Sequence, residues 1–77
     1  MKIEILGMGC PSCVKLEKNA GEAVKSAGIE AEIVKVSDMN KIMSYGVTRT
    51  PALVVDGHVK SSGQVLKADE IEKFFNQ

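Results

Sequence analysis

Alternating and periodic hydrophobic positions divide the chain into strands and helices. Residues 2–6 alternate, with Ile3 and Ile5 on one face, which predicts a strand. Hydrophobic residues then recur every three or four positions over 11–27, as on one face of a helix. This stripe consists of Cys13, Leu16, Ala20, Ala23, Val24 and Ala27. Gly28 follows the last of these residues and predicts the end of the helix.

The second half of the chain continues to alternate between strand and helix patterns. The predicted elements are a strand over 31–36, a short helix from about 38 to 45, strands over 52–55 and 58–62, and a final helix over 67–76. Asp56-Gly57 favours a two-residue hairpin between the last two strands. Met39, Ile42 and Met43 have helical spacing in the short helix, so we predict that both methionines lie in the core.

The resulting order of elements is β-α-β-α-β-β-α, which is an α/β chain. The first β-α-β unit should be parallel and right-handed, and the hairpin adds two more strands. We therefore predict a four-stranded mixed sheet with helices on both faces. A chain of 77 residues supports one hydrophobic core, so residues 1–77 should form a single domain.

Composition and charge exclude several classes of function. Ten basic and ten acidic residues give a formal net charge of +0, which favours neither nucleic acid nor a membrane surface. No hydrophobic run approaches the roughly 20 residues of a membrane span. The charged, short stretch over 1–7 does not resemble a secretory signal, so we expect a cytoplasmic protein unless a leader is removed. We also expect a monomer.

The chain contains two cysteines, Cys10 and Cys13, in a C-x-x-C motif. A disulfide across so short a loop adds little stability, so redox or metal chemistry is the better explanation. Cys10 directly precedes the predicted helix, where unpaired N–H groups and the helix dipole favour a thiolate. We therefore predict that Cys10 attacks a disulfide and that Cys13, one turn later, resolves the mixed disulfide.

The same loop also suggests a metal carrier. Gly7-Met8-Gly9-Cys10-Pro11-Ser12-Cys13 resembles the G-M-x-C-x-x-C loop of heavy-metal-associated domains, in which two thiolates carry copper(I) or mercury. The motif alone does not distinguish this function from redox exchange. A binding module with unreactive thiols is a third alternative.

A second segment favours the redox alternative. Residues 45–57 resemble the thioredoxin pattern Y-G-(I/V)-x-x-x-P-(T/A)-L-x-x-x-x-G, and the similarity continues through Gly63 and the closing helix. The chain is similar to short prokaryotic thioredoxin- or glutaredoxin-like redox-active disulfide proteins, which share the L-E-K-N-A run at 16–20. Heavy-metal-associated domains have the different order β-α-β-β-α-β. The resemblance implies a thioredoxin-like fold over essentially the whole chain.

The resemblance also implies a substrate-binding surface. In that superfamily the proline at the position of Pro51 is cis and opens the third strand next to the C-x-x-C motif. Thr50 would then present its backbone to an extended substrate, as in strand addition. We expect Met8, Pro11 and Ser12 to complete this surface.

The predicted activity is thiol–disulfide exchange through a Cys10–Cys13 disulfide, without a metal or bound cofactor. The partners would be a disulfide-containing protein and an upstream reductase or small thiol. Ser12 adds no charge that would destabilise the oxidised form, so we expect a reducing role. Glu4 falls near the position of thioredoxin's buried aspartate, but it alternates with isoleucines, so we expect it to be exposed. We expect Arg49 to be a solvated loop residue.

Overall fold

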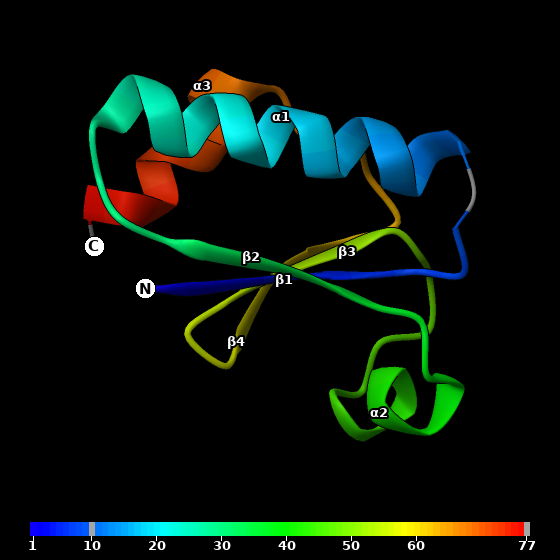
Figure 1. Ribbon diagram of the computed structural model, residues 1–77. Coiled ribbons are helices and arrows are strands. Elements are labelled where there is room, and N and C mark those ends of the chain that lie inside the picture. Colours follow the sequence, from blue (N-terminus) through cyan, green and yellow to red (C-terminus); the bar gives the residue numbers. More distant parts are fainter. Residues whose placement is uncertain (10, 77) are drawn as a thin grey trace.

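A four-stranded mixed sheet runs through the centre of the molecule in the order β2-β1-β3-β4 (Figure 1). The computed structural model describes residues 1–9 and 11–76. The strands are β1 (Lys2–Leu6), β2 (Glu32–Val36), β3 (Ala52–Val55) and β4 (His58–Ser62). The helices are α1 (Pro11–Ala27), α2 (Met39–Ser44) and α3 (Ala68–Glu72), and a 3₁₀ turn over Lys73–Asn76 follows α3. The predicted order of elements and the mixed four-stranded sheet are confirmed.

The strand pairing follows from the lengths of the connections. β1 and β2 are parallel because α1 crosses between them, and β1 and β3 are antiparallel. β3 and β4 form a hairpin through Asp56 and Gly57, whose φ angles of 49° and 83° suit a tight turn between twisted strands. β1 therefore has a hydrogen-bonded neighbour on each side.

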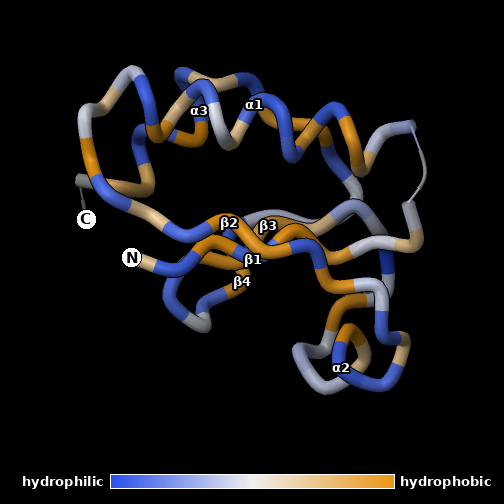
Figure 2. The backbone as a smooth tube through the Cα atoms, viewed as in Figure 1, coloured by the Kyte–Doolittle hydropathy of each residue, from blue (hydrophilic) through white to orange (hydrophobic). Residues whose placement is uncertain are grey.

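Both faces of the sheet are covered, but by different amounts of helix. α1 and α3 lie together on one face, and α2 lies on the other, near the end where β1 leaves the sheet (Figure 1). The larger core joins the first face to α1 and α3, and its buried residues are Ile3, Ile5, Leu16, Ala20, Ala23, Leu53, Val55, Leu66 and Ile71. The smaller core lies beneath α2, and its buried residues are Leu6, Val36, Ile42, Val47, Ala52 and Val54. Figure 2 shows hydrophobic residues gathered on the strands between these helices.

The local signals for α1 and α2 are satisfied at their ends. Gly28 follows α1 with a φ of 67°, in the left-handed region that favours glycine. Asp38 caps α2, because its side chain accepts a hydrogen bond from the Asn40 N–H at 3.0 Å. The predicted bounds of α1 are confirmed, and α3 ends earlier than predicted because its last turn is 3₁₀.

The prediction for the two methionines of α2 is wrong. Met39 is 51 % exposed and Met43 is 64 % exposed, whereas Ile42 between them is 2 % exposed. α2 has only six residues and rests on the sheet through one side of a single turn. Helical spacing therefore grouped three residues correctly on a helix, but only Ile42 contacts the core.

Within the described residues, no helix has the length and hydrophobicity that crossing a membrane requires.

Candidate functional site

The candidate site lies at the end of the sheet where β1 ends and β3 begins. Leu6 pairs with Ala52 at this end, so the residues beyond them, Gly7 and Pro51, leave the sheet side by side. The Gly7 N–H donates to the Val36 carbonyl at 2.9 Å, which extends the sheet by one residue. Two segments far apart in the sequence thus meet at this end of the sheet, which is called the site edge below.

Gly7 brings two predicted site residues together. A Cβ atom at position 7 would overlap the sulfur of Cys13 and would lie 3.1 Å from the Cys13 Cβ and 4.0 Å from the Thr50 Cβ. Cys13 and Thr50 therefore flank Gly7 closely. The sequence pattern places Gly7 in a loop and does not predict this contact. The available signal was a glycine directly after a buried strand, where a close approach of the backbone is common.

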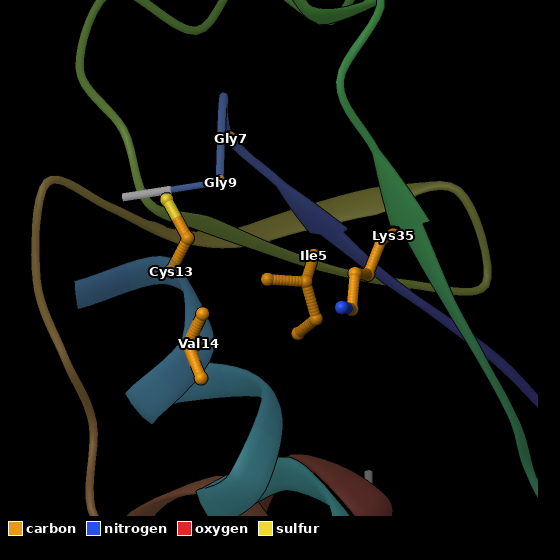
Figure 3. Close-up of a pocket in the computed structure, with 6 residues that line it drawn as sticks. All are labelled: Ile5, Gly7, Gly9, Cys13, Val14 and Lys35. Carbon is orange, nitrogen blue, oxygen red and sulfur yellow. The ribbon is translucent and has the colours of Figure 1, made fainter. Parts of the chain in front are cut away.

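Cys13 lies in the first turn of α1 and faces the sheet. It is 6 % exposed and begins the buried stripe that continues with Leu16. Its sulfur points towards Gly7 and Gly9 in Figure 3. A small pocket of about 40 Å³ adjoins it, and the lining residues are Ile5, Gly7, Gly9, Cys13, Val14 and Lys35. The position suits a thiol that reacts with a neighbouring sulfur rather than with a large external group. Cys10 lies outside the described residues.

The predicted substrate-binding residues are mostly exposed at this edge. Met8 is 59 % exposed, and Pro11, Ser12 and Thr50 are also exposed. Pro51 is buried, and the Thr50–Pro51 peptide bond is cis, the isomer that the resemblance implies. Met8 therefore contributes hydrophobic surface beside the site.

Gly63, which follows β4, anchors Pro51 at the site edge. Its N–H donates to the Pro51 carbonyl at 2.9 Å, and its φ is 72°. A Cβ at Gly63 would lie 3.0 Å from the Arg49 Cβ, so the Arg49 side chain covers this backbone. Arg49 itself is exposed, as expected for a loop charge.

The prediction that Glu4 is exposed is wrong. Glu4 is 4 % exposed because β1 is an inner strand and the Tyr45 side chain, which follows α2, reaches across this face to its carboxylate. The Tyr45 hydroxyl donates a hydrogen bond to its carboxylate, and the Lys2 ammonium lies 3.5 Å from the other oxygen. Ile5, the next residue, lines the Cys13 pocket, so the Glu4 side chain lies on the opposite face. The pKa of Tyr45 is raised above its ordinary value of 10.0. The largest cause is the hydrogen bond to Glu4, and burial and the negative charge of Glu4 contribute less.

One ion pair lies beside the pocket. The Lys35 ammonium is 3.6 Å from a Glu17 carboxylate oxygen, which joins β2 to α1 one turn after Cys13. The Glu17 side chain is 30 % exposed.

The architecture and the site together define a class of protein. A helix follows β2, and the chain continues through a hairpin to a closing helix, which is not the order of a heavy-metal-associated domain. A buried cysteine in the first turn of α1, close to the residue before a cis proline, is the arrangement of a thioredoxin-like fold.

Comparisons with known proteins agree with this class. The profile of the thioredoxin domain family matches residues 1–76. The chain is 49 % identical over 76 residues to a thioredoxin from Methanothermobacter thermautotrophicus, covering 99 % of each chain. It is 39 % identical over 71 residues to a thioredoxin from Methanocaldococcus jannaschii, covering 92 % of this chain and 81 % of the other. The chain therefore belongs to the thioredoxin domain family, which confirms the resemblance found in the sequence.

Proposed function

We propose that the protein is a thiol–disulfide oxidoreductase that exchanges disulfides through Cys10 and Cys13. The whole-length similarity to two proteins named thioredoxin is the observation that carries this proposal. The position of Cys13 beside Thr50 supports it independently, because the sulfur lies close to an exposed residue that a substrate can reach. No finding favours the metal-carrier alternative.

The proposed exchange has two steps. The Cys10 thiolate attacks one sulfur of a substrate disulfide, forms a mixed disulfide and releases the other sulfur as a thiolate. The Cys13 thiolate then attacks the Cys10 sulfur, so the Cys10–Cys13 bond forms and the second substrate sulfur leaves. Two electrons pass to the substrate, and each released thiolate takes a proton from solvent. The exchange needs no bound cofactor or metal.

Substrate recognition in this proposal uses the exposed edge beside Cys13. Thr50 would pair its backbone with an extended segment of the substrate, and Met8, Pro11 and Ser12 would provide the surrounding contacts. An upstream reductase or a small thiol would return the Cys10–Cys13 disulfide to the dithiol. We assign a reducing role in the cytoplasm, where thiols are kept reduced.

Reduction of insulin disulfides tests this proposal. With dithiothreitol as electron source, the protein should accelerate insulin precipitation, and Cys10→Ser and Cys13→Ser should each lose the acceleration. Ser26→Ala, an exposed position in the last turn of α1, is the matched control and should behave as the unaltered protein. A rate equal to that of dithiothreitol alone would contradict the proposal, as would full activity in either cysteine variant.

A further inference from the structure

A hydrogen bond beneath α2 fastens the chain segment that leads to the proposed substrate edge. We propose that Tyr45 and Glu4 form a positioning pair that holds Thr50 in place for a protein substrate. The pair does not touch the thiols, and its role rests on the proposed function.

Glu4 is a rigid anchor for this contact. Its backbone lies in the middle of the sheet, in register with Val34 of β2 and Val54 of β3. Its carboxylate is buried, and each oxygen has a neighbour, the Tyr45 hydroxyl on one side and the Lys2 ammonium on the other. Buried polar oxygens need such partners. The position of the acceptor is therefore fixed by the sheet.

Tyr45 stands where α2 ends and the segment towards the site begins. Its N–H caps the helix by donating to the Ile42 carbonyl at 3.2 Å. Gly46 follows with a φ of 76°, which turns the chain back towards the sheet, and Val47 is buried. The side-chain hydrogen bond of Tyr45 thus joins this turn to β1.

The segment between the turn and the site is exposed but held at both ends. Residues 48–50 are exposed, whereas Val47 and Pro51 on either side are buried. The far end is fixed by the hydrogen bond that the Gly63 N–H donates to the Pro51 carbonyl. The near end rests on Val47 and on the Tyr45–Glu4 hydrogen bond, because α2 itself buries only Ile42. Loss of the hydrogen bond would let the near end shift and would move the Thr50 backbone relative to Cys13.

This geometry separates two kinds of substrate. A protein disulfide that pairs with the Thr50 backbone depends on the position of the segment. A small disulfide that only meets the thiols does not. The pair therefore controls recognition of protein substrates, and the thiol chemistry itself is independent of it.

Second-order rate constants for insulin and for 5,5′-dithiobis(2-nitrobenzoic acid) test the proposal. For Tyr45→Phe the insulin constant should fall roughly three- to tenfold, the range set by one hydrogen bond, and the constant for the small reagent should stay within about twofold. Glu4→Leu should behave in the same way. Glu4→Gln keeps an acceptor oxygen and should restore most of the insulin rate. Ser26→Ala, at an exposed position in the last turn of α1, is the matched control and should leave both constants unchanged.

The outcomes separate this proposal from the proposed function. If the unaltered protein reduces neither disulfide, the proposed function fails. If it reduces both and Tyr45→Phe leaves both constants unchanged, the positioning role is wrong. An equal fall in both constants would also overturn it, since a general loss of structure affects both substrates. Circular dichroism of each variant establishes that it is folded.

Discussion

The sulfur of Cys13 lies in the space that a side chain at position 7 would fill. Protein interiors are packed so closely that one added carbon is destabilising, and here the added carbon would overlap the Cys13 sulfur. Position 7 therefore requires glycine because the Cys13 sulfur occupies the space of a side chain, and not because of its backbone conformation. Gly21 in α1 differs, because the nearest atom to an added Cβ is the Ile33 Cδ1 at 4.0 Å.

Two alanine substitutions should consequently have opposite effects. Gly7→Ala should lower the free energy of unfolding by about 1–3 kcal/mol, the usual cost of overpacking. Gly21→Ala should raise it by up to about 1 kcal/mol, because alanine favours a helix more than glycine does. Urea unfolding of the reduced proteins measures both values. A neutral Gly7→Ala variant would show that Cys13 can move away from Gly7 without cost.

The C-x-x-C motif and the Thr50-Pro51 pair were recognised from sequence because they are local patterns. The contact between Gly7 and Cys13 and the burial of Glu4 were not. Both depend on which neighbours a residue acquires across the sheet, and alternation along β1 distinguishes its two faces without showing that both are covered. The attacking role of Cys10 stays a prediction from its place before the helix.

At the scale of elements, the bounds and the buried face were both predicted for the long helix α1, but only the position was predicted for the short helix α2. α1 has 17 residues with a regular hydrophobic stripe, a proline at its start and Gly28 after its end, so its bounds and its buried face could be predicted. α2 has a clear cap at Asp38, and its position was also predicted. Its buried face was not, because only one turn rests on the sheet and Met39 and Met43 face solvent.

Tyr45 reports directly on how α2 is attached to the sheet. It is the single tyrosine of a chain without tryptophan, so absorbance at 295 nm follows its ionisation alone. Because Glu4 raises the pKa of Tyr45, the folded protein should titrate above pH 10.0, and Glu4→Leu should bring the midpoint back towards that value. A midpoint at or below 10.0 in the folded protein would contradict the contact.

The raised pKa of Tyr45 also predicts how the free energy of unfolding changes with pH. The stabilising contribution of Tyr45 is fully present below the pKa of the unfolded chain and is lost as the pH rises through the higher pKa of the folded protein. The unaltered protein should therefore lose stability relative to Tyr45→Phe only in strongly alkaline solution. Urea unfolding at neutral and alkaline pH measures this difference.

At the scale of the whole molecule, the two hydrophobic cores and the candidate site occupy different parts of the fold. α1 and α3 cover one face of the sheet with most of the hydrophobic core, and α2 covers the other with a smaller one. The exposed residues of the candidate site gather at the end where β1 and β3 meet. With a formal net charge of +0, long-range attraction contributes little to partner choice. In the proposed function, recognition would then depend on the local surface around Met8 and Thr50.

Trapping the mixed disulfide tests the assignment of the attacking and resolving thiols. Reduced Cys13→Ser protein, mixed with insulin and digested without reductant, should yield a disulfide-linked peptide whose protein half contains Cys10, seen by mass spectrometry. Cys10→Ser should trap little under the same conditions. The absence of any adduct, or trapping through Cys13 in place of Cys10, would contradict the assignment of Cys10 as the attacking thiol and Cys13 as the resolving one.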